Sequence, residues 1–256
     1  MAFTLVQKAG NDNGAGAATT SIATAYTSDV TIGNLLIAVF GQGALGGGGF
    51  NVVTDTLGNN WTRAVLAPVP DGPMSIEIWF TIAVASGPNT VTFSQAPVTG
   101  FFELIVAEYA GIQNAQLDVV NFGLSADDVS VSTQPITTTK SNELIIVSGT
   151  ASVDAPNWTM DSGFTPELTQ SNNTNGSGFP SNLVFGDQIV NAIGTYSSTL
   201  TPDALPNHSL LLAAIAAFFQ PVTVTGITNT IPPDPRPLPW RVGKPRKSDG
   251  KHIMLK

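Results

Sequence analysis

Few residues in this chain could perform covalent chemistry. It has two histidines, His208 and His252, and no cysteine among 256 residues. Nucleophilic catalysis needs a general base beside the nucleophile, and His208, in "PNHS", is the candidate base for a Ser-His-Asp site. No GxSxG elbow accompanies it. We therefore interpret His208 as a turn histidine, predict no catalytic residue and expect a protein that is not an enzyme. A hydrolase is the weakest of the hypotheses kept open.

Carboxylate pairs are the other candidate catalysts, because two acids flanking a sugar bond are the machinery of glycosidases. The two pairs are Glu103 with Glu108, and Asp127 with Asp128. Since Glu103 and Glu108 lie five positions apart, their side chains would point to opposite faces of one strand. Asp127 and Asp128 lie in "LSADDVS", which is typical of a solvated turn. Neither pair is therefore predicted to be catalytic.

Asp55, in "VTDTLGNNW", could bind calcium together with neighbouring carbonyl oxygens, or it could fix a turn. Gly58, Asn59 and Asn60 follow it, and this order favours an Asx-type turn within a hairpin. No array of oxygen ligands like that of an EF-hand surrounds it, and no thiolate is available for a metal site. The turn is the preferred interpretation, and we predict no metal and no cofactor.

Tryptophans could form a stacking platform for a sugar ring, and Trp61, Trp79 and Trp158 are the candidates. Trp79 is the strongest of them because it alternates with isoleucine and phenylalanine in "SIEIWFTIAV" and so points to the opposite face of the strand. A second sheet covering that face would bury Trp79 instead. A glycan contact at Trp79 is kept as an alternative hypothesis.

Strands joined by turns must position these residues. Three segments are apolar on both faces and are predicted to be central strands: Asn34–Phe40, Phe101–Tyr109 and Glu143–Gly149. Turn sequences such as "TIGN", "SGPN" and "DSGF" separate the apolar runs. We predict an all-β fold: a two-sheet antiparallel β-sandwich of jelly-roll or Greek-key type with an extended C-terminal arm.

One segment of the first half is similar in sequence pattern to a segment of the second half. "TSDVTIGNLLIAVF" and "TTTKSNELIIVSG" both place a Thr/Ser-rich stretch and a polar turn before a buried strand. Such a repetition suggests two related half-motifs, as in a double-layer jelly roll or a Greek-key sandwich.

Composition sets the broad class. Charged residues are 11% of the chain and hydrophobic residues 42%, which argues against disorder. The first residues, "MAFTLVQKAG", lack the basic and apolar regions of a signal peptide. The longest apolar run, Leu210–Phe219, is too short to span a bilayer. We expect a soluble protein that is made in the cytoplasm and has no membrane partner.

Positive charge is concentrated at the C-terminus. Residues 1–230 hold three basic and 16 acidic residues, a formal charge of −13, whereas residues 231–256 hold seven basic and two acidic residues, +5. The prolines of "IPPDPRPLP" favour an extended, polyproline-like spacer. An acidic body repels phosphate, so we predict a protein partner and no nucleic acid.

We accordingly divide the chain into a β-sandwich domain, residues 1–220, and a Pro-rich basic C-terminal arm, residues 221–256. A purely solvated tail would not need the apolar residues of this arm. The arm residues predicted to bind a partner are both basic and apolar: Arg236, Trp240, Arg241, Lys244, Arg246, Lys247, Ile253, Met254 and Leu255.

Several segments together resemble a β-sandwich domain of bacterial surface proteins and bacteriophage structural proteins. They are "SDVTIGNLLIAVF", "VVTDTLGNNWTRA", "IEIWFTIAVASGPNTVTFS", "ELIVAEYAGI" and "YSSTLTPDALPNHSLLLAAIAAF". The resemblance implies a sandwich displayed on a cell or virion surface, and it brings no catalytic residues with it. The lack of a signal peptide and the presence of the basic arm favour the phage branch.

We therefore expect a non-enzymatic virion structural protein of a bacteriophage. Its expected role is that of a capsid decoration or cement protein anchored by the arm, with a tail or baseplate component as the near variant. The predicted partners are copies of itself and other virion proteins, such as a major capsid or tail protein. The alternative is a carbohydrate- or receptor-binding module on a phage or cell surface, contacting host glycan through Trp79 or the segment Gly41–Asn51.

Overall fold

The computed structural model describes residues 3–13, 18–44, 50–70, 74–96, 99–111, 114–126, 129–152, 157–161, 163–172, 181–203 and 210–221. Within these ranges the regular structure consists of strands, with no helix. Their pairing is antiparallel. The predicted all-β antiparallel sandwich fold is confirmed. The predicted arm contacts, from Arg236 to Leu255, lie outside the described residues, so the arm stays a prediction.

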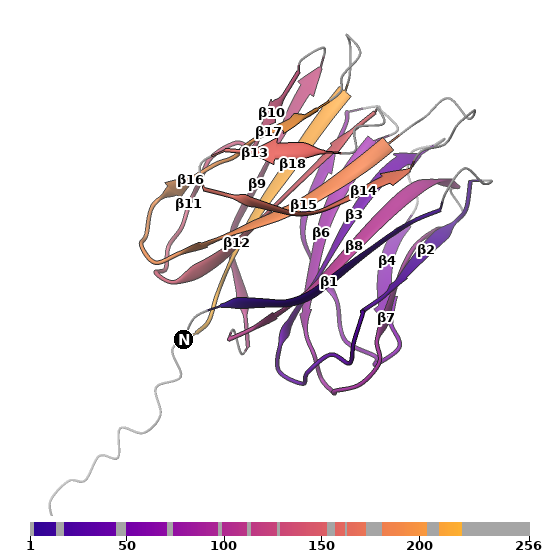
Figure 1. Ribbon diagram of the computed structural model, residues 1–256, viewed down its shortest axis with the longest axis vertical. Coiled ribbons are helices and arrows are strands. Elements are labelled where there is room, and N and C mark those ends of the chain that lie inside the picture. The colour runs from indigo at the N-terminus through magenta and orange to yellow at the C-terminus, as the bar shows by residue number, and fades with distance from the viewer. Residues whose placement is uncertain are drawn as a thin grey trace, which may run out of the picture. The chain divides into compact units, whose positions relative to one another are not determined.

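The first half of the chain forms two sheets (Figure 1). Its strands are β1 (Thr4–Asp12), β2 (Ser21–Ala25), β3 (Leu35–Ala44), β4 (Phe50–Asp55), β5 (Thr62–Pro68), β6 (Met74–Ile82), β7 (Thr90–Ala96) and β8 (Gly100–Ala110). The five-stranded sheet has the order β1-β8-β3-β6-β5, and the three-stranded sheet has the order β2-β7-β4.

The second half contributes three sheets. Its strands are β9 (Gln116–Ala126), β10 (Val131–Ser132), β11 (Ile136–Thr137), β12 (Glu143–Ala151), β13 (Trp158–Met160), β14 (Thr165–Asn172), β15 (Ser181–Val190), β16 (Thr195–Tyr196), β17 (Thr199–Pro202) and β18 (Leu210–Phe219). The five-stranded sheet has the order β14-β15-β12-β18-β9. Two small sheets, β10-β17-β13 and β11-β16, complete this half.

The two halves share one topology. Taken in chain order, β9 corresponds to β1, β12 to β3, β14 to β5, β15 to β6 and β18 to β8, and the two five-stranded sheets then have the same strand order. In the small sheets, β10 and β11 take the place of β2, β13 that of β4, and β16 and β17 that of β7. Each half is a jelly roll whose fifth strand has joined the edge of the larger sheet. The described part of the chain is therefore a tandem pair of jelly rolls.

The echoed sequence segments form the equivalent central strands of this repeat, β3 and β12. Each strand follows a residue with a positive φ angle, Gly33 at 86° and Asn142 at 58°. Glycine adopts this backbone conformation freely, and asparagine is among the other residues found there most often. The same turn geometry thus starts the same strand twice, as the predicted half-motifs suggest.

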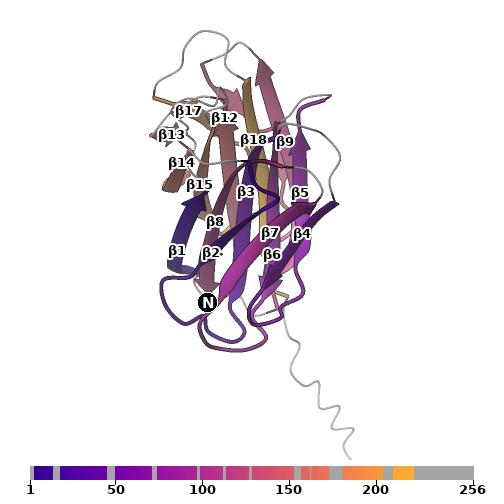
Figure 2. The same cartoon turned by 90° about the vertical axis from the view of Figure 1, so that its right-hand side faces the viewer.

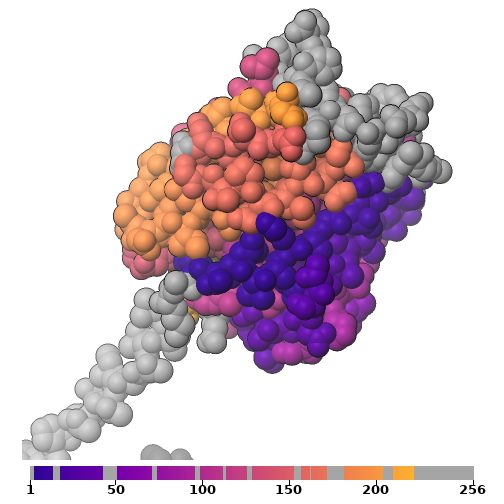
Figure 3. Space-filling model, viewed as in Figure 1, coloured from indigo at the N-terminus to yellow at the C-terminus, as the bar shows by residue number. Residues whose placement is uncertain are grey.

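Three apolar clusters hold the sheets together. One lies between the two five-stranded sheets, and each of the other two lies between a five-stranded sheet and the smaller strands outside it. Figure 2 shows the resulting layers, with β1 and β14 along one side and β5 and β9 along the other. In Figure 3 the indigo-to-magenta first half and the orange second half occupy separate areas, with β1 running along their boundary.

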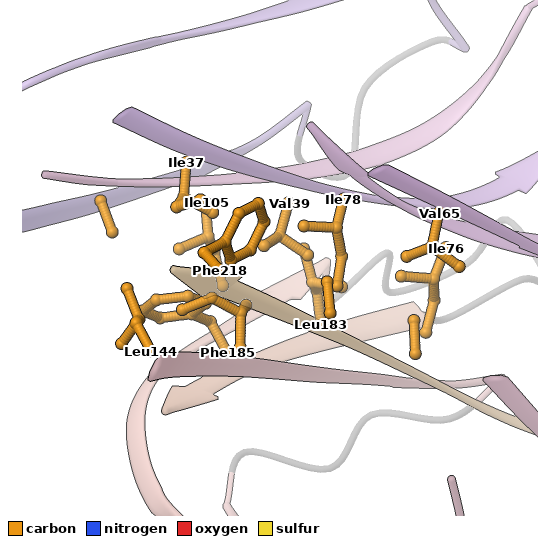
Figure 4. Close-up of a cluster of buried hydrophobic side chains, with 14 of the residues drawn as sticks. Ile37, Val39, Val65, Ile76, Ile78, Ile105, Leu144, Leu183, Phe185 and Phe218 are labelled. Atoms are coloured by element: carbon orange, nitrogen blue, oxygen red, sulfur yellow. The ribbon is translucent and has the colours of Figure 1, made fainter. Parts of the chain in front are cut away.

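The central cluster joins the two jelly rolls. Figure 4 shows Ile37, Val39 and Ile105 of the first half turned toward Leu144, Phe185 and Phe218 of the second. All six side chains are fully buried, and burying a side chain of this size contributes about 1.5–3 kcal/mol. The predicted central strands are confirmed, because β3, β8 and β12 are buried on both faces.

Candidate functional site

The interface between the two jelly rolls ends in a rim on each side. β1 lies beside β14 at one rim, and β5 lies beside β9 at the other (Figure 2). Since β9 corresponds to β1 and β14 to β5, the same pair of equivalent strands meets at both rims. This reciprocity is that of an isologous dimer, in which both partners offer the same surface. The two rims can therefore be compared position by position.

The β1/β14 rim is closed by polar side chains. Lys8 Nζ lies 2.5 Å from Glu167 Oε2, and the two side chains are 34% and 18% exposed. The Gln170 side-chain amide donates a hydrogen bond to the carboxylate of Asp12. These two contacts join the edge strands of the two jelly rolls along this rim.

Beneath the same rim, Tyr109 and Asp187 form a hydrogen bond. The Tyr109 hydroxyl donates to Asp187 Oδ2 over 2.6 Å. Burial, with the nearby charge of Asp187, raises the pKa of Tyr109 well above its ordinary value, so the hydroxyl keeps its proton. Burial also raises the pKa of Asp187, although the Tyr109 hydrogen bond opposes this rise. Glu167 acts with burial on Asp187, and Lys8 acts against it. The polar side chains of this rim thus form one electrostatic network.

The β5/β9 rim is apolar at the equivalent positions. β1 pairs with β8, and β9 pairs in the same way with β18, the equivalent of β8. These registers place Val120, Phe122 and Leu124 of β9 at the positions that Lys8, Gly10 and Asp12 occupy in β1. Both β5 and β14 have a register shift at the same place in the sheet. At this shift, the residue without a cross-strand partner is Glu167 in β14 and Ala64 in β5. Val120 and Ala64 thus occupy, at the β5/β9 rim, the positions that the ion pair of Lys8 and Glu167 occupies at the β1/β14 rim.

The buried pair beneath this rim is apolar as well. Phe218 and Phe80 take the positions of Tyr109 and Asp187 in the repeat. Their rings meet edge to face with centroids 5.1 Å apart, an arrangement favoured by aromatic quadrupoles. A hydrogen bond in one rim is therefore replaced by a ring contact in the other.

The apolar side chains of β9 are partly open to solvent. Val120, Phe122 and Leu124 are 37%, 39% and 43% exposed, and we call these three residues the β9 strip. They alternate with Asn121 and Gly123, so the sequence alone indicates a half-buried strand. Sequence reasoning missed the strip as a candidate site because only the packing of two sheets leaves this row at a rim.

Asp55 forms the predicted turn. Its Oδ1 accepts from the backbone N–H of Asn59 over 3.0 Å, and its Oδ2 accepts from the side chains of Asn59, Trp61 and Asn89 over 2.6–3.1 Å. Gly58 has a φ of 72° within the turn. Burial alone would raise the pKa of Asp55, but these hydrogen bonds outweigh it and lower the pKa. The carboxylate is thus engaged by donors of its own chain.

Trp79 corrects an expectation. It lies on the outer face of its sheet, in the apolar cluster beneath the three-stranded sheet, and is only 9% exposed. Its indole N–H donates to Glu77 Oε2 over 2.8 Å, and Arg63 lies 5.7 Å above its ring. Since another sheet covers that face, no sugar ring can stack on it. The alternative considered for Trp79, burial beneath a second sheet, is the arrangement found in the structure.

Glu77 itself has no exposed surface. Arg63 Nη1 lies 3.4 Å from its carboxylate, and the side-chain amide of Asn51 also donates to it. Burial raises the pKa of Glu77, while the contacts to Trp79, Arg63 and Asn51 oppose the rise. These contacts tie β4, β5 and β6 together.

The predicted carboxylate pair of β8 does not converge. Glu103 pairs across the sheet with Gly41 and Glu108 with Leu36, which places them on opposite faces. Glu108 accepts hydrogen bonds from Gln7, Asn34 and the backbone N–H of Thr31. It anchors the turn before β3 and offers no partner for Glu103. The predicted placement of Glu103 and Glu108 on opposite faces of one strand is confirmed.

The structure brings together a different pair of acids, Asp118 and Glu143. Thr139 donates its backbone N–H and its hydroxyl to Asp118 over 2.6 and 2.5 Å. The backbone N–H of Lys140 donates to Glu143 over 3.0 Å. Burial, with the hydrogen bond and the charge of Asp118, raises the pKa of Glu143 to about 7. The pair joins the starts of β9 and β12, and no local sequence pattern announces it.

The remaining candidates lie outside the described ranges: His208, His252, Asp127, Asp128 and the nine residues of the arm. Trp158 is buried, and its indole N–H donates to Asn182 Oδ1 over 2.9 Å. Among the residues with described positions, no group of three acidic or histidine side chains could hold a metal ion. The same residues contain no helix long and apolar enough to cross a membrane.

Comparison with known proteins gives no relative. No family model matches the chain, and neither a curated protein nor a solved structure matches it. The function is therefore argued from the chain itself.

Proposed function

We propose that this protein is a non-enzymatic structural protein of a bacteriophage virion, a capsid decoration protein anchored by its C-terminal arm. The observation that carries the proposal is the separation of charge along the chain, −13 over residues 1–230 and +5 over residues 231–256. An extended basic arm on an acidic body suits docking along the acidic surface of an adjacent copy or another shell protein. A tail or baseplate component is the near variant.

The fold is compatible with this role. Double-sheet jelly rolls are common in viral capsid proteins, although lectins and cupins use them too, so the fold by itself decides no function. The sequence resemblance to phage structural proteins points to the virion among these possibilities.

The polar groups of the body also fit a structural role. The carboxylates of Asp55, Glu77 and Glu108 are each engaged by several donors of the same chain. Catalytic carboxylates need a reacting group within hydrogen-bond reach. Groups used to tie strands together instead support a rigid particle component.

A host-glycan module is less well supported, because burial of Trp79 removes one of the two contacts named for it. Binding of the purified protein to a glycan array, absent from a variant altered in the segment Gly41–Asn51, would restore that alternative.

Removal of residues 231–256 tests the virion proposal. We expect the shortened chain to fold, as judged by circular dichroism and a cooperative unfolding transition, and to be missing from purified particles when these are analysed by mass spectrometry. A matched full-length variant carries Trp240→Ser and Leu255→Ser, which keep the charge of the arm and remove apolar anchors. Normal incorporation of the shortened chain would show that the arm does not anchor the protein.

A further inference from the structure

We propose that the β9 strip, Val120, Phe122 and Leu124, is a surface through which two copies of this chain associate. The inference goes beyond the proposed function, because it concerns the folded body and does not require the arm. It rests on the exposure of the strip, its lack of charge and its position at the end of an existing jelly-roll interface.

The strip is a continuous apolar row. Its residues alternate along one edge strand and share one face with Leu212, Ala214 and Ala216, their buried partners in β18. Leu117, on the same face, packs partly against the central cluster. Scattered exposed apolar residues are ordinary on protein surfaces, whereas a contiguous row next to a core marks an interaction site.

At the β1/β14 rim, the equivalent edge is covered by polar side chains. At the positions of the strip, β1 carries Lys8 and Asp12, which bind Glu167 and Gln170 of β14. Polar pairs of this kind satisfy one another and discourage association with other molecules. The β5/β9 rim lacks them and leaves apolar surface in contact with water.

Charge favours a second copy at this place. β9 has no ionisable residue from Val119 to Ser125, and β5 has none from Ala64 to Pro68. Residues 1–230 together carry −13, so two bodies that approach through most other surfaces oppose like charges. Between Val119 and Ser125 apolar area can be buried with no acidic side chain in the contact, and the nearest acids in the sequence, Asp118 and Asp127, lie beyond the two ends of this stretch.

Side-chain packing is the expected mode of contact. The Phe122 carbonyl accepts the backbone N–H of Gln134 over 3.3 Å, and the Asn121 side-chain amide donates to the carbonyl of Pro135 over 3.1 Å. These contacts occupy part of the open edge of β9, so a strand of a second copy could not simply extend the sheet. A two-fold arrangement would instead lay one strip antiparallel on the other, with Phe122 near the axis.

The size of the strip sets the expected affinity. From Leu117 to Leu124 β9 spans about 23 Å, and packed sheets are separated by about 10 Å, so the strip offers a few hundred Å² per copy. Stable complexes bury about 800 Å² per partner. The pair should therefore be weak in solution and gain strength where many copies are arrayed on one surface.

Sedimentation velocity of the full chain, from micromolar to submillimolar concentration, tests the association. We expect the unaltered chain to shift from monomer toward dimer as concentration rises, and Phe122→Asp to stay monomeric. The matched control is Ile193→Asp, since Ile193 is 61% exposed between β15 and β16 and is not a residue of the strip. The control should dimerise like the unaltered chain. Thermal unfolding of each variant establishes that it is folded.

Cysteine cross-linking tests the geometry without relying on an aspartate in the strip. The chain has no cysteine, so every disulfide reports an introduced residue. A mixture of Val120→Cys and Leu124→Cys chains should form mixed dimers faster than either forms its own, because an antiparallel contact places these positions opposite one another. Ile193→Cys should cross-link slowly.

Three results would overturn the inference. They are a chain that stays monomeric at every concentration, cross-linking at the strip no faster than at Ile193, and a dimer that dissociates with Trp240→Asp but not with Phe122→Asp. The last result would assign the association to the arm. Normal incorporation of the shortened chain into particles would contradict the proposed anchoring by the arm and leave this inference unaffected, so the two proposals can fail separately.

Discussion

Tyr109 and Phe218 occupy the same position in the two jelly rolls and differ by one hydroxyl group. Tyr109 pairs with Leu35 at the start of β3, and Phe218 pairs with Leu144 near the start of β12. The Tyr109 hydroxyl binds Asp187, whereas the Phe218 ring meets Phe80. One interface thus has a polar rim and an apolar rim built on the same backbone.

The first prediction concerns that hydroxyl. Tyr109→Phe should lower the free energy of unfolding by about 1–3 kcal/mol, because Asp187 keeps its half-buried position and loses a donor. Urea denaturation measures the change. In the Tyr109→Phe background, Asp187→Asn should recover part of the loss, because an amide is cheaper to bury than a carboxylate. A double variant less stable than Tyr109→Phe would contradict this account.

The second prediction concerns pH and Glu143. Its pKa is about 7 in the folded chain and 4.5 ordinarily, so the folded state holds the proton more tightly than the unfolded state. The resulting stabilisation is complete below about pH 4.5 and is lost as the pH rises through about 7. Glu143→Gln should remove this decline, which a pKa change of this size limits to about 3 kcal/mol. Thermal unfolding between pH 5 and 8 measures it.

Asp118→Asn provides the matched control for Glu143, because it removes the neighbouring negative charge and keeps Glu143 in place. It should weaken the pH dependence without abolishing it, since burial is the largest cause of the raised pKa. If Glu143→Gln unfolds with the same pH dependence as the unaltered chain, the pair of Asp118 and Glu143 is not the source of that pH dependence.

Much of the fold could be predicted from apolar patterning. Short segments that are apolar on both faces and bounded by turn sequences favour central strands covered twice, and β3, β8 and β12 are such strands. The turn at Asp55 was also readable, because Asp, Gly and Asn in that order have a local preference that tertiary packing did not override. The similar segments in the two halves were interpreted as half-motifs of one double-layer sandwich, whereas the structure places them in two successive jelly rolls.

The candidate site was harder to predict, because it depends on which sheet covers which face. The alternation of apolar and polar residues along the strand places Trp79 on the face opposite the central core. It does not show whether that face meets solvent or a second sheet. For the same reason, the alternation of Val120, Phe122 and Leu124 with Asn121 and Gly123 cannot distinguish a row covered by a sheet from one left at a rim. The pairing of Asp118 with Glu143 joins two strands distant in sequence, and no local pattern records such a contact.

The third prediction concerns the turn acid. Asp55→Ala should destabilise the chain by about 2–3 kcal/mol, because it leaves donors of Asn59, Trp61 and Asn89 without their acceptor. The lowered pKa adds a pH effect: the carboxylate stabilises the fold above its ordinary pKa of 3.8, and this contribution is lost as the pH falls through the lower folded value.

Asp29→Ala is the control for Asp55, since Asp29 is exposed on the loop before β3. It should change the urea midpoint little at neutral pH. Equal effects of the two substitutions would mean that the hydrogen bonds of the turn contribute nothing measurable.

The fourth prediction separates two reasons for glycine. A β-carbon at Gly123 would lie 1.9 Å from the Ser132 carbonyl oxygen, whereas one at Gly33 would meet no atom within 4 Å and face only an unfavourable φ of 86°. Gly33→Ala should therefore cost about 1 kcal/mol. Gly123→Ala should cost about 3 kcal/mol or more, because β9 and the backbone of β10 must move apart. Urea unfolding of both variants gives the comparison, and a smaller loss for Gly123→Ala would show that β10 yields easily.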